Sequence, residues 1–473
     1  MLYYRSILFD QLTPIAIYNK LQSIFKDEVT ILFESAINSE EGNYSFLFIG
    51  ARERVFLKDE KSFYIDENGK KIEIEKNPFE FLKKRYASVD KNRYKEYTNK
   101  LNIGFIDGFV GYMGYDLVKT FEPVLSSHMD NLKDPLKTPD LDLIRPKLTC
   151  AFSHKSNTLT IFTFVEELGK KLDKIINRLK EPHYYIPIKK SKIDKSKGSF
   201  AFSKDNFFEM VKKSKEMIRS GDVFQILMSN RFTQYAHIDK LSFYRILRNK
   251  NPSPYMFNLQ YEKFSIIGSS PEVMVALKDG HITLRPIAGT RKRGKDFDSD
   301  LEMEKELLND EKERAEHLML IDLGRNDVGK VAKVGSVKVK EMMRVERYSH
   351  VMHLVTDIEA VLDKKYDMFD LFGATFTAGT MTGTPKIRAM ELISDFEGLK
   401  RGFYSGAVGY FGFDGNMDSA IMIRTAYLDD EKIVFQAGAG IVADSKPELE
   451  YLEVTNKLGA MTSSLDDLSD ETI

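Results

Sequence analysis

The sequence predicts an α+β protein built around a large, mostly antiparallel β-sheet. Two observations lead to this prediction. The chain contains apolar runs typical of strands, among them FSIIGSSPEVMVAL and KIVFQAGAGIV, and it contains long stretches with helical spacing of apolar residues. These strands and helices come in groups. Strict alternation would favour a doubly wound parallel sheet, whereas grouped strands favour antiparallel pairing.

The elements fall into two regions of the 473-residue chain, which is longer than a single core usually allows. We expect an N-terminal region over 1–186, a Lys- and Ser-rich polar linker over 187–200, a second region over 201–465 and a C-terminal tail over 466–473. In the first region we expect strands in YSFLFIGARERVFL, FVGYMGY and TLTIFTFV, and a helix in EELGKKLDKIINRLKE.

The second region begins with a predicted helix, SKDNFFEMVKKSKEMIRS, which Gly221 ends. Further strands are expected in DVFQILMSNRF, FSIIGSSPEVMVAL, HITLRPIAGT, SVKVKEMMRVE and KIVFQAGAGIV. A last helix is expected in SKPELEYLEVTNKLGAM, with Pro447 near its first turn.

Composition excludes several classes of function. The formal net charge is -1, so no overall field favours nucleic acid or an anionic membrane. No stretch approaches the roughly 18 apolar residues of a membrane span, and the N-terminus lacks the pattern of a signal peptide. The single cysteine, Cys150, excludes an internal disulfide and a Cys-rich zinc site, and its strand-like surroundings indicate a packed thiol. We therefore expect a cytoplasmic protein.

Two acidic residues far apart in the sequence are candidate ligands of a divalent cation. On a helix, Glu316 shares a face with Met319, Leu320 and Leu323. A carboxylate on an apolar face needs a cation or a donor, so a core ion pair and a metal ligand both stay open. For Glu450, an exposed acidic stripe is the plainer interpretation. Together the two would form the oxygen-lined site that Mg²⁺ prefers, and no cluster of His and Cys indicates zinc.

Four further features could bind or transform an anion, although each also has a structural interpretation. His353 lies on an alternating apolar run, where a hydrogen-bonded core histidine is the commoner case. Glu272 follows a Ser-Ser-Pro turn, where carboxylates often only shape the turn. Arg424 stands in an apolar strand and would suit a carboxylate of the protein or of a ligand. Small residues at 438–440 would let backbone N–H groups approach an anion, or simply form a tight turn.

Nine motifs occur in order over about 200–465. They are GDVFQILMSNRF, NPSPYMF, GSSPE, RPIAGTRKRG, AEHLMLIDLGRND, VMHLV, AGTMTGTPKIRAMELI, GAVGYFGFDGNMDSAIMIRTA and QAGAGIVADSKPELEYLE. In this order they closely resemble the chorismate-utilising enzymes, and among these the anthranilate synthase component I family. The N-terminal region is similar more loosely, through LTPIAIYNKL, ILFES, YSFLFIG and FVGYMGYDLV. The resemblance implies large sheets packed as a sandwich, with helices outside and the active site in a central cleft.

The resemblance also implies a reaction. A lyase would convert chorismate and ammonia to anthranilate and pyruvate, the first committed step of tryptophan biosynthesis. The family's catalytic residues fall on Glu272 and His353, and its magnesium ligands fall on Glu316 and Glu450. Its chorismate-binding residues fall on Gly289, Thr290, Tyr404, Arg424, Gly438, Ala439 and Gly440.

Feedback inhibition by tryptophan is a further implication of the resemblance. The family's inhibitor-binding residues fall on Ser35, Pro254, Tyr255 and Met256. The first of the two motifs reads LFES here, where the family has LLES. Because this change stays apolar, we expect sensitivity to tryptophan.

Two positions distinguish among the relatives. Ala288 stands where enzymes that form aminodeoxychorismate usually carry a nucleophilic Lys, and Gln225 stands where enzymes that add water carry a Lys base. Ala288 cannot attack the ring, which leaves the site to ammonia. The alternatives are aminodeoxychorismate synthase component I and a non-catalytic tryptophan-sensing homologue. Because Cys150 is the only cysteine, we expect ammonia to come from a separate glutamine amidotransferase subunit, in a hetero-oligomer.

Overall fold

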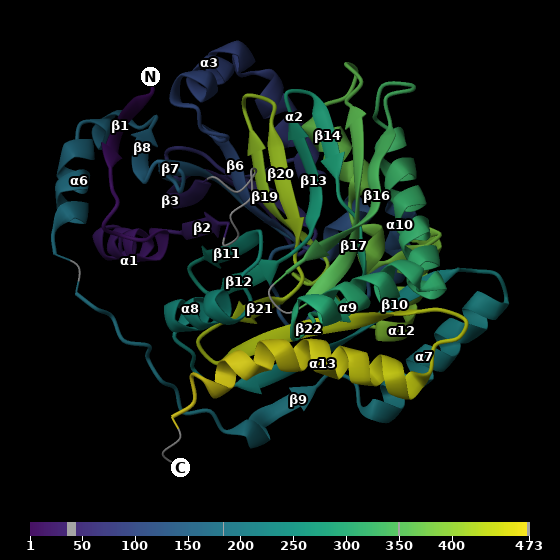
Figure 1. The fold of residues 1–473 in the computed structure, drawn as a ribbon. Helices are drawn as coiled ribbons and strands as arrows, with labels where there is room; N and C mark the ends of the chain where they lie inside the picture. Colours follow the sequence, from purple (N-terminus) through teal and green to yellow (C-terminus); the bar gives the residue numbers. More distant parts are fainter. Residues whose placement is uncertain (36–43, 183, 349–350, 471–473) are drawn as a thin grey trace.

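The computed structural model describes residues 1–35, 44–182, 184–348 and 351–470 (Figure 1). Within these residues every pairing between named strands is antiparallel, and the strands form one connected network. The predicted α+β class with antiparallel sheets is confirmed. Of the predicted tail, residues 471–473 lie outside the described part of the chain.

The network can be followed from strand to strand. Its main path runs through β9 (Gly198–Phe200), β10 (Gln225–Tyr235), β22 (Lys432–Ile441), β21 (Thr425–Leu428), β12 (Ser265–Ser270), β11 (Tyr255–Gln260), β2 (Thr30–Glu34), β3 (Tyr44–Lys58), β7 (Leu141–Ser153), β6 (Gly108–Met113), β19 (Ala407–Gly412), β20 (Met417–Ile421), β13 (Val273–Lys278), β14 (His281–Leu284) and β17 (Val351–Val361). Beside this path lie β15 (Ile287–Lys292) and β16 (Lys338–Arg347) on β17, β18 (Gly383–Thr384) on β10, β4 (Lys61–Ile65) on β3, β5 (Lys71–Glu73) on β4, β8 (Thr158–Thr163) on β7, and β1 (Tyr3–Leu8) on β8.

The helices lie between these strands in the sequence and outside them in space (Figure 1). They are α1 (Pro14–Ile24), α2 (Pro78–Ala87), α3 (Lys91–Leu101), α4 (Ser126–Met129), α5 (Glu166–Gly169), α6 (Leu172–Lys180), α7 (Lys204–Arg219), α8 (Lys240–Lys250), α9 (Phe297–Asn309), α10 (Glu311–Gly329), α11 (Met368–Thr375), α12 (Lys386–Glu397) and α13 (Pro447–Asp466).

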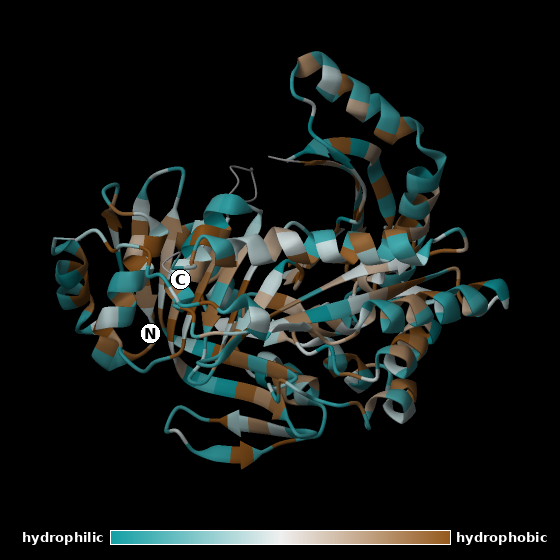
Figure 2. Cartoon of the chain, turned by 90° about the horizontal axis from the view of Figure 1, so that it is seen from below, coloured by the Kyte–Doolittle hydropathy of each residue, from teal (hydrophilic) through white to brown (hydrophobic). Residues whose placement is uncertain are grey.

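Two halves of the strand path pack face to face around a shared core. Leu227 of β10 and Ile266 of β12 belong to the same buried cluster as Val110 of β6 and Val408 of β19. The opposite face of β10 and β22 is covered by helices, and α13 runs along it in Figure 1. In the view from below, brown segments occur along the strands inside the molecule, while the helices outside carry both teal and brown residues (Figure 2). Burial of these apolar faces, at about 25 cal/mol per Å², is what holds the layers together.

Strands of the two predicted regions pair with one another. Glu34 of β2 lies opposite Met256 of β11, and Met113 of β6 lies opposite Ala407 of β19. The segment 187–200 runs against the second region, where the backbone N–H of Lys189 donates to the hydroxyl of Ser242 at 3.0 Å. Residues 1–186 therefore help to build the sheet that carries the later motifs.

Two predicted helices show that local sequence signals and tertiary packing both determine where a helix begins and ends. Helix α7 begins after Ser203, whose hydroxyl accepts from the N–H of Asn206, and Gly221 follows it with φ 85°. The single helix predicted over EELGKKLDKIINRLKE is instead two, α5 and α6. The ring of Tyr3 packs directly on Gly169, at the end of α5.

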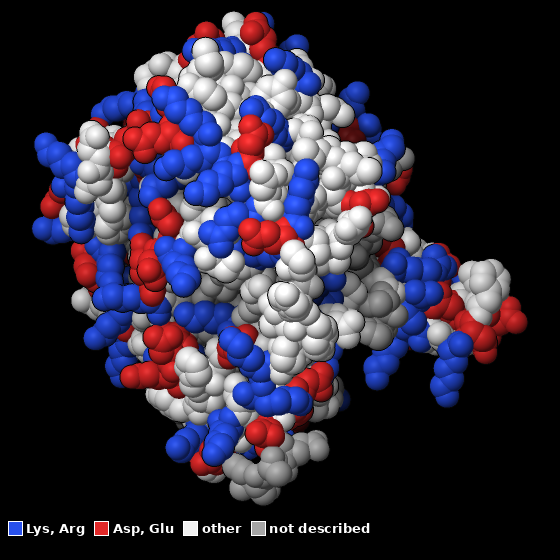
Figure 3. All heavy atoms as spheres, turned by 90° about the vertical axis from the view of Figure 1, so that its left-hand side faces the viewer, with Lys and Arg blue, Asp and Glu red and all other residues white. Residues whose placement is uncertain are grey.

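The described residues contain no helix long and apolar enough to cross a membrane. On the face drawn in Figure 3, Lys and Arg are interspersed with Asp and Glu, as the balanced composition leads one to expect.

Candidate active site

The candidate site is centred on two neighbouring interruptions of the antiparallel strands. At one of them β12 gives way to β13, and at the other β20 gives way to β21. Backbone hydrogen bonds cross between the interruptions: Ile421 N–H donates to the carbonyl of Glu272 at 3.0 Å, and Ser269 N–H donates to that of Arg424 at 3.1 Å. Glu272 and Arg424 therefore lie at the same height along two neighbouring strands, each where its strand is interrupted.

Glu272 is a buried acid. Only 6% of the residue is exposed, and the hydroxyl of Thr380 donates to its Oε1 at 3.1 Å. Burial raises the pKa of Glu272 to about 8, against the Thr380 hydrogen bond and the charge of Arg424, which both lower it. The carboxyl group is therefore mostly protonated at neutral pH and can donate a proton.

Arg424 lies between β20 and β21. It is among the exposed residues, yet enough protein surrounds the guanidinium that burial lowers its pKa, while the neighbouring Tyr348 and Glu272 raise it. Its backbone is left-handed, with φ 49°, a conformation that costs a residue with a side chain about 1–2 kcal/mol. A guanidinium that a ligand can reach, but that burial has partly desolvated, is well suited to binding a carboxylate.

His353 lies on β17 beside the bulge of β15. The bulge falls between Ala288 and Arg291, and Gly289 there has φ 63°, the left-handed region that glycine adopts readily. Nδ1 of His353 lies 2.8 Å from the carbonyl oxygen of Gly289 and 3.2 Å from Oγ1 of Thr290.

The carbonyl of Gly289 can only accept a hydrogen bond, so Nδ1 of His353 carries the proton and Nε2 keeps its lone pair. Burial lowers the pKa of His353, of which 7% is exposed, although the bond to Gly289 raises it. The imidazole is therefore neutral near pH 7, with a basic nitrogen available.

The small residues 438–440 lie on β22 between Tyr404 and α13. A Cβ atom on Gly438 would come within 3.0 Å of the hydroxyl of Tyr404, and the ammonium of Lys457 on α13 donates to the carbonyl of Gly438 at 3.0 Å. A Cβ atom on Gly440 would overlap the side chain of Gln225. Ala439, which is fully buried, separates the two glycines. Close packing here explains why residues this small are needed.

Tyr404 rests on a buried ion pair. The guanidinium of Arg401 lies 5.8 Å from the Tyr404 ring centre and is bound at 2.9 and 2.7 Å by the two carboxylate oxygens of Glu397. The remaining Arg401 donors reach the carbonyls of Met381 and Leu227, both at 2.9 Å. With all partners satisfied, this pair can fix the ring without an unpaired buried charge.

Glu316 lies on α10 and is half-buried, as its predicted place on the apolar face requires. The amide Nε2 of Gln225 donates to its Oε1 at 3.0 Å. Since Gln225 also packs against Gly440, it joins α10 to the strand that leads into α13.

Glu450 lies in the first turn of α13 and is 7% exposed. Burial raises its pKa, while a hydrogen bond with Ser445 and the more distant charges of Lys312 and Lys457 lower it. Lys312 lies one helical turn before Glu316 on α10, so this part of α10 faces the start of α13.

Glu316 and Glu450 carry the oxygen ligands that a hard divalent cation prefers. Both are partly or fully withdrawn from water, and neither is in ion-pair contact in the described structure. Among the described residues no group of three or more His, Cys, Asp or Glu is arranged to hold a metal. Mg²⁺ is typically bound by one or two protein carboxylates, while substrate and water complete its coordination shell.

The four residues predicted to bind an inhibitor lie where the N-terminal sheet joins the second region. Met256 pairs with Glu34, the residue before Ser35, across the β2–β11 ladder. The hydroxyl of Tyr255 donates to a carboxylate oxygen of Asp418 at 3.2 Å, and the half-buried Pro254 precedes it. The structure thus brings Ser35, Pro254, Tyr255 and Met256 to one region.

A family model described as chorismate binding enzyme matches residues 30–463. The chain belongs to this family. Anthranilate synthase component 1 from Aquifex aeolicus is 42% identical over 477 residues, which cover 98% of this chain and 94% of that one. The crystal structure of anthranilate synthase component I from Streptococcus pneumoniae TIGR4 superposes with a TM-score of 0.78 at 32% identity, covering 97% and 99% of the two chains.

A menaquinone-specific isochorismate synthase from Escherichia coli has the same fold. Its TM-score is 0.72 at 16% identity, covering 98% of this chain and 95% of that one. The same fold therefore occurs in a protein named for a different product, so the fold alone does not identify the product of this chain.

Three contacts of the site were missed by sequence reasoning. The sequence does not indicate that Thr380 contacts Glu272 or that Gln225 bonds to Glu316. Nor does it indicate that the ring of Tyr348 lies 5.5 Å from that of His353. The signal available was that Thr380 and Gln225 fall inside motifs of the chorismate binding enzymes.

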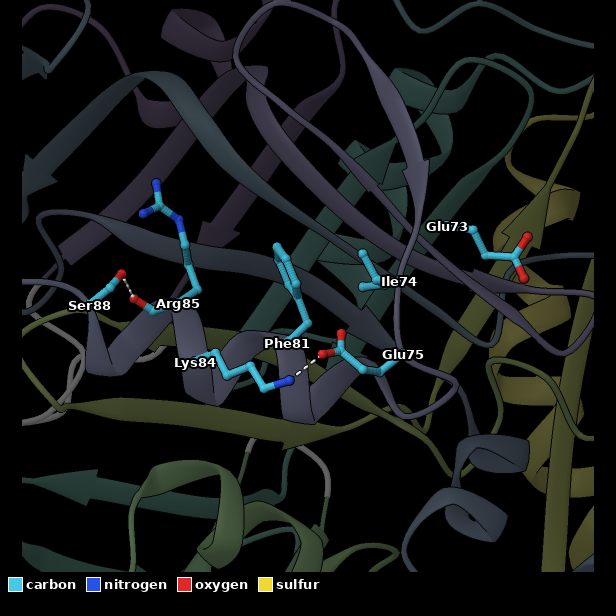
Figure 4. Close-up of a pocket in the computed structure, with 7 residues that line it drawn as sticks. All are labelled: Glu73, Ile74, Glu75, Phe81, Lys84, Arg85 and Ser88. Atoms are coloured by element: carbon cyan, nitrogen blue, oxygen red, sulfur yellow. Dashed lines mark hydrogen bonds and ion pairs between the residues drawn. The ribbon is translucent and has the colours of Figure 1, made fainter.

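A separate hollow lies between β5 and α2 (Figure 4). Its polar side chains have partners of their own: Lys84 is paired with Glu75, and Arg85 with the buried Glu53. None of the predicted site residues lines it. Glu272 instead borders a cavity of about 30 Å³, room for roughly one water molecule.

Proposed function

We propose that the chain is the large subunit of an anthranilate synthase. It would convert chorismate and ammonia to anthranilate, pyruvate and water. The observation that carries the proposal is a buried acid, protonated at neutral pH, on the strand next to the accessible cation Arg424. The relatives of that name, which match nearly the whole chain, support the choice of product.

Chorismate carries a ring carboxylate and an enolpyruvyl carboxylate. We assign the enolpyruvyl carboxylate to Arg424 and Tyr404, since a guanidinium can bind both oxygens and a phenol can donate a third hydrogen bond. Backbone N–H groups at 289–290 and 438–440 are the further donors that we assign to the ligand.

Glu316 and Glu450 would hold Mg²⁺ over the ring carboxylate. When bound, the ion neutralises this carboxylate and orients the ring. Gln225 would keep one oxygen of Glu316 occupied and so direct the other toward the ion.

In the first half of the reaction ammonia adds to C2 of the ring as the C4 hydroxyl leaves. Hydroxide is a poor leaving group, and Glu272 would donate the proton that lets it leave as water. Ala288 has no nucleophile to compete with ammonia, and Gln225 cannot act as the base that would activate water.

In the second half the amino intermediate loses pyruvate. The C2 proton must leave, the bond from the ring to the ether oxygen breaks, and the enolpyruvyl methylene takes up a proton, which gives an aromatic ring. Nε2 of His353 is our candidate base, because its Nδ1 is held by Gly289 and its pKa is lowered.

Ammonia would be supplied by a separate glutamine amidotransferase subunit. Release of ammonia from glutamine by hydrolysis needs a nucleophilic thiolate. Cys150 is fully buried on β7, and burial raises the pKa of its thiol, so it is unsuited to this role.

We further propose that tryptophan binds between Ser35 and 254–256 and inhibits the reaction.

The proposal is tested with the purified chain, chorismate, Mg²⁺ and ammonium. Anthranilate is followed by its fluorescence and pyruvate by reduction with lactate dehydrogenase. We expect both products in equal amounts, and little of either when glutamine replaces ammonium. An amino product formed without pyruvate would favour aminodeoxychorismate synthesis, and no consumption of chorismate would favour a non-catalytic homologue.

A further inference from the structure

The fully buried Ser269 contacts two functional segments at once. It lies on β12, whose neighbours on either side are β11 and β21 (Figure 1). Its hydroxyl makes hydrogen bonds to the carbonyl of Asn251 and, at 2.9 Å, to the hydroxyl of Ser253. Both partners belong to the motif NPSPYM, which leads directly into the residues assigned to the inhibitor.

The backbone of the same residue reaches the active site. Ser269 N–H donates to the carbonyl of Arg424 at 3.1 Å. The next residue, Ser270, lies opposite Tyr255 in the ladder, and its hydroxyl accepts a hydrogen bond from the N–H of Glu272 at 3.3 Å. The segment 251–256 is therefore joined through Ser269 and Ser270 to the backbone of Arg424 and of Glu272.

The conformation of Arg424 makes it sensitive to a displacement of this segment. Its φ of 49° is one that non-glycine residues seldom adopt and that persists only where the surroundings enforce it. The N–H of Ser269 is one of the groups that hold its carbonyl in place. If Ser269 shifts, the backbone at Arg424 can relax and redirect the guanidinium.

We propose that Ser269 is a positioning residue that couples the inhibitor segment 251–256 to Arg424 and Glu272. The proposal rests on the function proposed above. It predicts that tryptophan and chorismate weaken each other's binding, by equal factors in both directions. Removing the Ser269 hydroxyl leaves the backbone bond to Arg424 and the ladder pairing with Met256, but it breaks the bonds that hold Asn251 and Ser253.

The test compares two Ser→Ala variants on the same strand. Ser269→Ala removes the coupling hydroxyl. Ser265→Ala is the matched control, because Ser265 is also fully buried and its hydroxyl has no partner among the residues that the structure describes. Since the chain contains no tryptophan, fluorescence of the ligand itself, excited beyond the tyrosine band, reports its binding.

Dissociation constants for tryptophan are measured with and without saturating chorismate and Mg²⁺, in the absence of ammonia and glutamine so that no anthranilate forms. The wild-type ratio of the two constants is expected within the usual range of about 5 to 150. We expect Ser265→Ala to keep this ratio within about twofold and Ser269→Ala to reduce it about fivefold or more, toward one.

A merely structural role would lower the melting temperature of Ser269→Ala and shift both constants equally, leaving the ratio unchanged, and this result would overturn the proposal. A wild-type ratio of one, or no tryptophan binding, would overturn it too, while the anthranilate assay would still stand on its own. If Ser269→Ala fails to fold, Ser269→Cys retains the size with a weaker hydrogen bond. It should then give a reduced ratio, and a wild-type ratio would refute the coupling.

Discussion

Replacing Thr380 by Val tests the role of Glu272 as the acid. The Thr380 hydroxyl donates to Glu272 Oε1 at 3.1 Å and so favours the ionised carboxylate. Without this donor the charged form is less stable, and the pKa of Glu272 must rise above its value of about 8. The protonated form, which donates to the leaving hydroxyl, then persists to higher pH.

The size of the effect follows from the bond that is lost. A hydrogen bond to a charged group contributes about 1.5–3 kcal/mol, and about 1.4 kcal/mol corresponds to one pKa unit. The alkaline limb of kcat against pH should therefore move upward by about one unit or more, while the plateau near neutral pH changes little.

The assay is anthranilate formation between about pH 6 and 10, with the concentration of free ammonia held constant at every pH. Thr380→Ser retains the hydroxyl and is the control, with an expected limb at the wild-type position. An alkaline limb that stays in place in Thr380→Val, or that moves to lower pH, would refute the assignment of this limb to Glu272.

Three other variants probe the rest of the site. Arg424→Lys loses the planar fork, so KM for chorismate should rise about tenfold or more with a smaller change in kcat, and an unchanged KM would remove Arg424 from the binding site. Gln225→Ala frees Glu316, so Mg²⁺ affinity measured by calorimetry should fall about tenfold, whereas wild-type affinity would show that Gln225 does not orient the ligand. Ala288→Lys places an amine beside the ring and should erode anthranilate formation, and unchanged product and rate would contradict the role given to Ala288.

Periodicity and grouping predicted a good part of the architecture. The strand-like run FSIIGSSPEVMVAL became β12 and β13, and the helical spacing around Glu316 correctly placed this residue on the partly buried face of α10. Such local patterns are encoded within a few turns or strand residues, where a single sequence carries enough information.

Contacts across long separations could not be predicted in the same way. Thr380 and Glu272 are 108 positions apart, and Gln225 and Glu316 are 91 apart. The approach of Glu272 to Arg424 depends on β12 pairing with β21, a choice of partner that no local pattern specifies. Likewise, no local pattern indicates that the ring of Tyr3 packs on Gly169, at the end of α5.

The most direct test of the account is to locate the divalent ion itself. Crystals grown with Mn²⁺ and chorismate, in the absence of ammonia, would show the ion by its anomalous scattering. We expect one site, with a carboxylate oxygen of Glu316 and one of Glu450 each about 2.0–2.3 Å from the ion and the ring carboxylate completing the shell. An ion bound by only one of the two residues, or at a position remote from both, would contradict the proposed chemistry.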